Sequence, residues 1–414
     1  MAGASTYIYG RKKRSFVVVI NQLLLLLLTA VCMLTPLYGF QKMIVLLGLF
    51  AMWYVTTITI DPKWIDESVA PLLFLVAILL LDFFYGAVTN NSELESYGFN
   101  KIPTFMWVVP FVFYSKRTYL LNNYVYLTFI ILLISSGLTI SGNILFPGAS
   151  RLLASGNHLE AVRGMYRAMG IGGYDFIFAL VFLIMPAIIS IQQKTFNALF
   201  FIISIAVFIV TILFGAYMIG ILFAIFSGVL AIATRKRKIS FKSILIIGIA
   251  AALVFGFLFD FLADFGERYG IDVLGRRSEE ITTGTYGDRE DDMNRIVLYK
   301  NGILNWLSRP FFGDLEGGNE TLLPSGHSEL IGFLERYGIF SLLYFGFLRR
   351  FYLSVKRRIT SDNIRASFKL YYLIILIFML IDRFDTSVGI GFVVFFLAPL
   401  LFIIASSNSK ELSK

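Results

Sequence analysis

The sequence has very few of the residues that build metal centres and cross-links. Among its 414 residues there are 1 cysteine, Cys32, and 2 histidines, His158 and His327. A single cysteine excludes an internal disulfide and a cysteine-based metal site, and two histidines exclude a histidine-rich metal centre. We therefore expect neither a metal nor a cofactor.

Charged residues are also scarce. They make up 15% of the chain, against 57% hydrophobic residues, whereas soluble domains average about 25% charged residues. An apolar run of about 20 residues crosses the bilayer core as a helix. We count twelve such runs, at 16–37, 43–60, 69–88, 102–114, 119–140, 173–192, 195–213, 215–234, 242–260, 326–347, 368–384 and 387–406.

This pattern predicts an all-α polytopic membrane protein that forms one integral membrane domain over residues 1–414. The shortest run, 102–114, makes the count of about 12 spans uncertain by one or two. The first run, 16–37, is too long for the core of a signal peptide and has no clear cleavage site. We therefore expect it to remain as a span.

Lysine and arginine clusters predict the orientation in the membrane. In a scheme of twelve spans they all fall on one side, which the positive-inside rule assigns to the cytoplasm together with both termini. The net charge of +9 is then mostly an orientation signal, and no soluble basic domain suggests a nucleic-acid partner. The clusters lie at 11–14, 116–117, 235–238, 349–350 and 356–358.

Two loops on the predicted outer side are long, at 141–172 and 261–325. Loops of more than about 12–15 residues tend to be functional or disordered, and the apolar residues in both loops favour function. The first loop is cationic, with three arginines, Arg151, Arg163 and Arg167. The second is acidic: 13 of the 27 Asp and Glu residues lie between residues 260 and 323.

The second loop contains a predicted amphipathic helix at about 289–309. Asp288 is placed to cap it, the acids at 290–292 favour its positive end, and Pro310 stops it. An apolar stripe, which lies either on lipid or on the helix bundle, is formed by Met293, Ile296, Val297, Leu304 and Leu307. The opposite, polar face carries Asp291, Arg295 and Arg309.

Arginines on the outer side are candidates for substrate binding, because the positive-inside rule depletes them there. Each offers a planar, permanently charged fork that suits pyrophosphate oxygens. The alternative is that they are solvated or paired with nearby acids. The candidates are Arg151, Arg163, Arg167, Arg289 and Arg295.

His327 opens the run at 326–347, at the depth of a lipid headgroup, where it can accept a proton near neutral pH. Its alternative role is a structural hydrogen bond. Glu335 and Arg336 lie two turns further into the same run, where charges are costly and face either a cavity or each other. Such charges either hold the helix bundle together or serve the function. The same two alternatives apply to Asp382, Arg383 and Asp385, and more weakly to Asp82.

Taken in order, these residues resemble the signature of Wzy-type O-antigen or capsular polysaccharide polymerases and the related O-antigen ligases. The matching elements are an arginine, a tryptophan, a P-x-x-G turn, a G-H-S helix start and an E-x-x-G-I segment. They stand here as Arg295, Trp306, 310–313, 326–328 and 335–339. The segment at 169–176 is also similar to polymerases of capsule-forming Gram-positive bacteria.

The resemblance implies a bacterial plasma-membrane enzyme with the C-type glycosyltransferase membrane fold. Its reaction would be an inverting, metal-independent transfer of an undecaprenyl-pyrophosphate-linked glycan onto a lipid-linked repeat unit. Arg295 would hold the departing pyrophosphate, and His327 would orient or deprotonate the acceptor hydroxyl. A flippase and a chain-length regulator of the same pathway would be partners.

Within this resemblance, Arg151 or Arg167 would supply a second phosphate contact. The paired arginine–glycine spacing of some members is found in neither loop, so the choice between them stays open. Three other functions also remain open. They are an O-antigen ligase with a lipid A-core acceptor, a transporter or lipid flippase with ionisable residues at mid-membrane depth, and a structural or sensing membrane protein.

Overall fold

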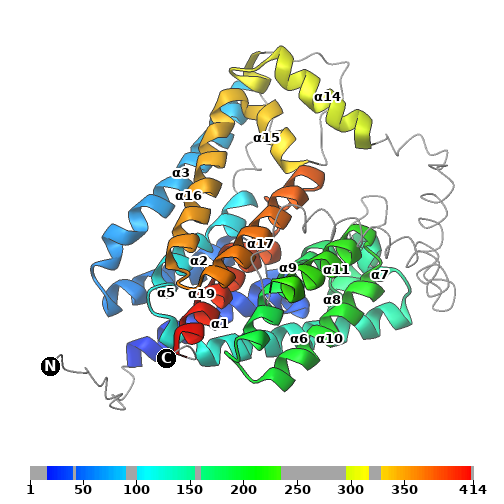
Figure 1. The fold of residues 1–414 in the computed structure, drawn as a ribbon. Coiled ribbons are helices and arrows are strands. Elements are labelled where there is room, and N and C mark those ends of the chain that lie inside the picture. The colour runs from blue at the N-terminus through cyan, green and yellow to red at the C-terminus, as the bar shows by residue number, and fades with distance from the viewer. Residues whose placement is uncertain are drawn as a thin grey trace.

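The computed structural model describes residues 16–40, 43–89, 100–153, 160–234, 295–316 and 328–411. These residues form helices and contain no strand (Figure 1). The longer helices before residue 235 are α1 (Phe16–Met33), α2 (Met43–Ile60), α3 (Trp64–Thr89), α6 (Asn122–Leu145), α9 (Tyr174–Gln192), α10 (Ala198–Gly215) and α11 (Met218–Ala233). After residue 294 come α14 (Arg295–Ser308), α15 (Glu329–Tyr337), α16 (Ser341–Arg358), α17 (Asp362–Ile381), the short α18 (Val388–Phe392) and α19 (Ala398–Glu411).

Short elements connect them. Between the early helices lie η1 (Thr35–Phe40), α5 (Val108–Tyr114), η2 (Thr118–Leu120), α7 (Ala149–Leu152) and α8 (Glu160–Ala168). The later connections are η3 (Gly313–Glu316), η4 (Gly338–Phe340) and η5 (Val393–Leu397), the last of which is a π-helical turn between α18 and α19.

In the described part of the chain, 9 helical stretches are long and apolar enough to cross a membrane. The prediction of a multi-pass, all-helical membrane protein is therefore confirmed, while the predicted number of about twelve spans stays a prediction. Each of the nine overlaps one of the twelve predicted runs. Of the remaining three runs, 242–260 lies outside the described residues, and 215–234 forms α11, which has 16 residues.

The predicted span at 102–114 is wrong. The chain forms one short helix at 100–105 and a second, the 7-residue α5, with a break at Met106 and Trp107. Pro110 explains the break, because it has no N–H to donate to the carbonyl of Met106 and its ring clashes there. Neither piece is long enough to cross a bilayer, and both are largely buried in the bundle.

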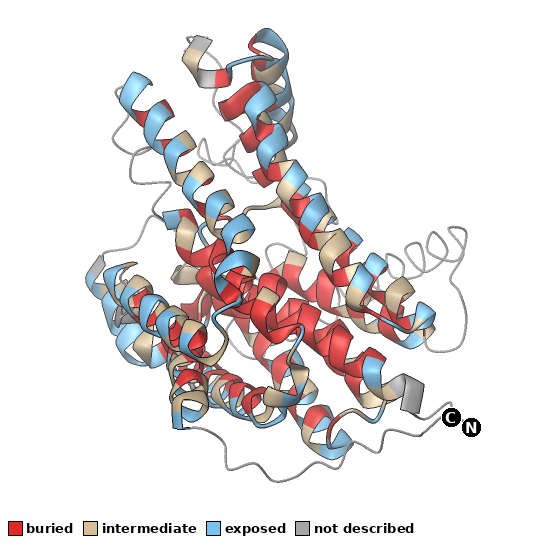
Figure 2. Ribbon diagram, turned by 90° about the vertical axis from the view of Figure 1, so that its left-hand side faces the viewer, coloured by how far each residue is buried: buried red, intermediate tan, exposed pale blue. Residues whose placement is uncertain are grey.

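The core lies where α9 packs against α18, η5 and α19. Every residue from Val388 to Ser406 is buried, as are most residues of α9, and Figure 2 shows this buried centre. Gly391 makes the packing possible, since a Cβ there would lie 2.4 Å from the carbonyl oxygen of Thr104. Small residues let helices in membranes approach closely in this way.

Asp175, in the first turn of α9, holds the start of α18. Its carboxylate accepts hydrogen bonds from the backbone N–H groups of Gly389 and Ile390, each 3.0 Å long. A negative charge is favourable at the positive end of a helix. The two central helices are therefore joined at the same end of the bundle.

Described members of two of the basic clusters, 116–117 and 356–358, lie at the other end. Lys116 lies 2.6 Å from Glu67, and Arg117 pairs with Asp61. The guanidinium of Arg358, at the end of α16, lies 5.6 Å from the centre of the Phe111 ring. This grouping agrees with the predicted cytoplasmic side, and the sidedness itself stays a prediction.

The stretch Glu329–Arg358 is bent, whereas the sequence predicts one uninterrupted span that begins at residue 326. Gly338 ends α15 with a φ of +53°, η4 follows, and α16 leaves in another direction (Figure 1). Glu335 and Arg336 therefore lie on α15, above the bend and against α14, and not two turns inside a straight membrane helix.

Candidate functional site

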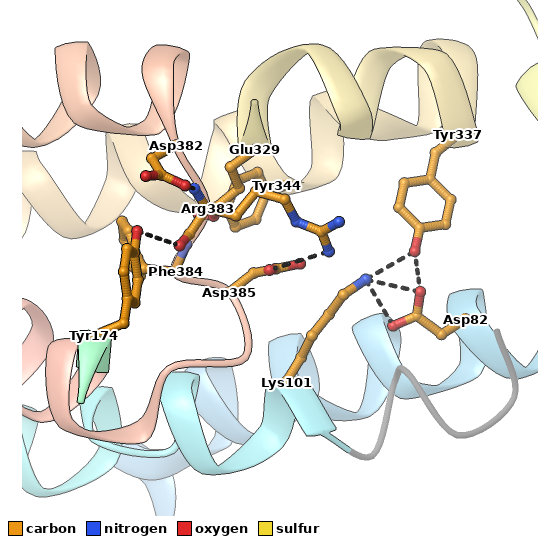
Figure 3. Close-up of polar contacts among 10 residues, drawn as sticks. All are labelled: Asp82, Lys101, Tyr174, Glu329, Tyr337, Tyr344, Asp382, Arg383, Phe384 and Asp385. Carbon is orange, nitrogen blue, oxygen red and sulfur yellow. Dashed lines mark hydrogen bonds and ion pairs between the residues drawn. The ribbon is translucent and has the colours of Figure 1, made fainter. Parts of the chain in front are cut away.

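The turn between α17 and α18 is the point where several helix ends meet. Glu329, at the start of α15, binds it twice: its N–H donates to the carbonyl of Asp382 (3.3 Å), and its carboxylate accepts from the N–H of Phe384 (3.0 Å). The hydroxyl of Tyr174, at the start of α9, donates to the carbonyl of Arg383 (3.1 Å; Figure 3). We call this group the polar patch: Tyr174, Glu329, Asp382, Arg383 and Asp385.

The patch contains both buried and accessible charges. Nη2 of Arg383 lies 3.4 Å from Oδ1 of Asp385, whose side chain is 2% exposed, whereas that of Arg383 is 28% exposed. Glu329 is buried and also accepts a hydrogen bond from the hydroxyl of Tyr344. The interior acids are therefore stabilised by fixed donors, while Arg383 and Asp382 are only half-buried.

Arg151 is brought toward this patch. It lies in α7, which is fixed to α6 by a hydrogen bond from Asn143 Nδ2 to Ser150 Oγ of 2.7 Å. The hydroxyl of Tyr217, just before α11, donates to the carbonyl of Ser150 (2.9 Å). Tyr217 interacts electrostatically with both Arg151 and Asp382. One guanidinium of the first long loop therefore lies on the same side of the bundle as the polar patch.

Helix α14 is fixed to the same region. The hydroxyl of Tyr299 donates to the carbonyl of Ile381 (2.6 Å), the residue before the polar patch turn. Further along, Nδ2 of Asn305 donates to Oε1 of Glu335 (2.6 Å). Because Tyr299 lies near the start of α15 and Asn305 near its end, the two helices run in the same direction (Figure 1). Arg295, one turn before Tyr299, begins α14 on the side of the patch.

The face of α14 that meets the bundle is not the predicted apolar stripe. The buried residues are Leu298, Gly302, Asn305 and Arg309, whereas Val297, Leu304 and Leu307 are exposed by 41%, 43% and 59%. Hydrogen bonds made by Tyr299 and Asn305 hold the polar side against α15 and α17. The stripe consequently faces away from the bundle, which favours the lipid-facing alternative. Arg309, which the spacing places on the face opposite the stripe, is buried.

The P-x-x-G turn and the E-x-x-G-I segment interlock. The N–H of Ile339 donates to the carbonyl of Phe311 (3.1 Å), and the Tyr85 hydroxyl lies 3.0 Å from the carbonyl of Phe312. Both glycines have positive φ, +56° at Gly313 and +53° at Gly338, and the backbone of the other segment fills the space of a side chain. Two motifs that are distant in sequence therefore form one structural unit that supports α14 and α15.

A buried ion pair lies below this unit. Nζ of Lys101 is 2.9 and 3.0 Å from the two carboxylate oxygens of Asp82 and 2.8 Å from the hydroxyl of Tyr337 (Figure 3). Both charged side chains are 1% exposed. A pocket beside them is lined mainly by apolar side chains, among them Phe333, Phe340 and Leu343. The pair links α3 and the 100–105 helix to α15.

The sequence-predicted site residues are thus only partly brought together. Arg151 acts electrostatically on Tyr217, which packs against Tyr174 of the polar patch. Arg295 begins α14, and its side chain is not described. In α8, Arg163 donates to the carbonyl of Leu153 (3.2 Å), and Arg167 is exposed. Glu335 supports α14, and the guanidinium of Arg336 lies 5.9 Å from the centre of the Tyr337 ring. Arg289 and His327 lie outside the described residues.

Sequence reasoning missed Lys101, Glu329 and Tyr174. Lys101 stands immediately before an apolar run and was therefore not counted as a charge inside the membrane. Glu329 follows two residues after His327, so its position at a helix start was a usable signal. No local pattern indicates that Tyr174 contacts residue 383.

The described residues contain no group of three His, Cys, Asp or Glu side chains that could hold a metal ion. The polar patch contains an arginine guanidinium group, which can bind phosphate oxygens. Beside it lie carboxylates and a tyrosine hydroxyl, which can bind sugar hydroxyls.

In comparisons with known proteins, no protein-family model and no curated protein matches this sequence.

Proposed function

We propose that this protein is a polysaccharide polymerase that transfers a glycan from undecaprenyl pyrophosphate onto a lipid-linked repeat unit at the outer face of the bacterial plasma membrane. The observation that carries the proposal is the convergence at one end of a helical membrane bundle. There α14 and the start of α15 are hydrogen-bonded to the turn of the polar patch, and Arg151 acts electrostatically on Tyr217, which packs against Tyr174 of the patch. These are the segments to which the family resemblance assigns the chemistry.

The reaction needs positive charge where the leaving pyrophosphate gathers negative charge, and a group that takes the proton of the attacking hydroxyl. Arg295 and Arg151 fill the first role, and His327 is the group that the resemblance assigns to the acceptor hydroxyl. No step in this scheme uses a metal, so we propose that chelators leave activity unchanged. The interlocked glycine turns hold α14 and α15 at a fixed separation, as catalysis by positioning requires.

The test is complementation of a polymerase-null strain with Arg295→Ala, Arg295→Lys and His327→Ala. We expect loss of long polymer at normal membrane abundance, because removing one donor to developing charge costs about 10²–10³ in rate. Arg295→Lys also fails, since an ammonium lacks the two-pronged contact. The matched control is Arg365→Ala, at the opposite end of the bundle, where the arginine pairs with the exposed Asp362. Full-length polymer from both alanine variants would refute the mechanism.

A second candidate is a transporter or flippase of lipid-linked anions. The specific observation in its favour is a set of buried charges on several segments, Asp82, Lys101, Glu329 and Asp385. Charges at such depth often mark transport pathways. Purified protein in vesicles distinguishes the two functions. A polymerase lengthens the glycan chain without moving the lipid across the membrane, whereas a flippase moves the lipid across the membrane without lengthening the glycan chain.

A further inference from the structure

The exposed face of α16 changes from apolar to cationic along its length. Leu342 and Leu343 are exposed, and so is Gly346, where nothing lies within 4 Å of an added Cβ. Arg349 and Arg350 follow, and both are exposed. Residues three and four apart lie on the same side of a helix, so these five positions form one strip. The strip has the polarity of a lipid, with an apolar part that ends at a charged part.

The depth of the two arginines follows from the neighbouring helix α3. The rings of Phe347 and Phe74 are stacked with centroids 3.5 Å apart, and α3 and α16 run antiparallel (Figure 1). Arg350 lies about 5 Å beyond Phe347 along the axis, whereas Glu67 lies about 10 Å from Phe74 in the same direction. Glu67 forms an exposed ion pair, which marks the level of water. Arg350 is therefore about 6 Å deeper than the water level, within the zone of lipid headgroups.

No acid in the described part of the chain forms an ion pair with Arg349 or Arg350. The segments 1–15 and 235–259, which the sequence predicts on the same side, contain no Asp or Glu. A charge at headgroup depth is costly unless an opposite charge lies beside it, so the two guanidinium groups need an anion from outside the protein. The acids at this end have basic partners of their own, namely Asp61 with Arg117, Glu67 with Lys116 and Asp362 with Arg365.

We propose that Arg349 and Arg350 bind the phosphate of an anionic phospholipid, whose acyl chains lie along Leu342, Leu343 and Gly346. A guanidinium offers paired N–H donors that match phosphate oxygens. A zwitterionic phospholipid fits less well, because its own cationic group repels the arginines. Arg357 lies about 10 Å nearer to water than Arg350, where salt screens its charge. The site is independent of the proposed polymerase function, since it lies at the opposite end of the bundle from the polar patch.

Native mass spectrometry of the full-length protein in detergent tests the site with phosphatidylglycerol and phosphatidylcholine of identical acyl chains. We expect tighter binding of phosphatidylglycerol. Each arginine near an anionic headgroup strengthens binding about fivefold, so Arg349→Gln/Arg350→Gln weakens it by about 30-fold. The matched control, Arg357→Gln/Lys63→Gln, removes two exposed positive charges at the same end and changes binding by less than about threefold. Because a micelle has no sides, charges that only orient the protein during insertion produce no lipid preference in this measurement.

Soluble glycerol phosphate provides a second arm, and we expect that it does not displace the bound lipid. Displacement would assign the arginines to a soluble phosphate and overturn the inference. Equal binding of the two lipids to the wild-type protein, or equal losses in the two double variants, would also overturn it. Both arginines are exposed, so the glutamine variant keeps the wild-type unfolding temperature in phosphatidylcholine. If it does not fold, the single variants Arg349→Gln and Arg350→Gln decide, each with a loss of about fivefold.

Discussion

Gly313 and Gly338 lie against each other's backbone segments. A Cβ on Gly313 would be 2.3 Å from the carbonyl oxygen of Arg336, and one on Gly338 would be 2.5 Å from the carbonyl oxygen of Phe311. Neither contact leaves room for an alanine, because the atom in the way is backbone in both cases. The two glycines therefore explain why the P-x-x-G and E-x-x-G-I segments occur together in the sequence.

The first prediction concerns these glycines. Gly313→Ala and Gly338→Ala each combine a positive φ with a backbone clash, so each lowers the free energy of unfolding by at least about 1–3 kcal/mol. Thermal unfolding of the detergent-solubilised variants measures the loss. Gly346→Ala in α16 is the control, since nothing lies within 4 Å of the added Cβ. A Gly338→Ala variant as stable as wild type would show that the interlock is absent in solution.

The second prediction concerns the buried pair of Lys101 and Asp82. Removing one partner leaves a buried charge uncompensated, so Lys101→Met or Asp82→Leu alone costs about 3–5 kcal/mol. The double variant costs less than either single one, because no lone charge remains. Comparing unfolding temperatures of the three variants checks this order. Lys116→Gln, which breaks an ion pair with 47% and 28% exposed side chains, changes stability by less than about 1 kcal/mol.

The third prediction separates the arginines of the first loop. Arg151→Ala lowers polymer formation by about 10²–10³, because its guanidinium acts electrostatically on Tyr217, which packs against Tyr174 of the polar patch. Arg167→Ala retains most activity, since this residue is exposed on α8. Quantified polymer from strains with equal protein abundance provides the measurement. Activity lost in the Arg167 variant and kept in the Arg151 variant would reverse the assignment.

The fourth prediction concerns sidedness. In a protein in which the buried Cys32 is replaced by alanine, single cysteines at Arg167 and Thr285 react with a membrane-impermeant maleimide added to intact cells. A cysteine at Lys116, which is 47% exposed at the basic end, reacts only after the membrane is opened. Labelling in the opposite pattern would invert the whole topology and place the polar patch in the cytoplasm.

Several features of the fold follow from sequence alone, for a simple reason. Long apolar runs have one stable arrangement in a bilayer, so the helices from 16 to 33, 43 to 60 and 174 to 192 were predictable within a few residues. The break at Met106 was missed although Pro110 signals it, because the run around it is uniformly apolar.

The site was less predictable than the helices. Hydrophobic spacing left open whether the apolar stripe of α14 meets lipid or the bundle, because it does not show that the hydrogen bonds of Tyr299 and Asn305 hold the opposite side against the bundle. The meeting of Tyr174, Glu329 and Asp382 depends on how three separate helix ends pack, which spacing within any one segment does not specify. The candidates Arg295 and His327 come from their predicted outer position and from an ordered motif, and their roles stay predictions.

The stretch Val388–Asn408, from the start of α18 nearly to the end of α19, also has a consequence for biogenesis. It follows all other described helices in the chain, yet every residue from Val388 to Ser406 is buried, and the mean hydropathy of the stretch reaches 2.8. The ribosome therefore completes the innermost helix after the helices that surround it. Until that moment Asp175 has no helix end to cap. We therefore expect this stretch to displace lipid and to enter sideways between helices that are already in the membrane.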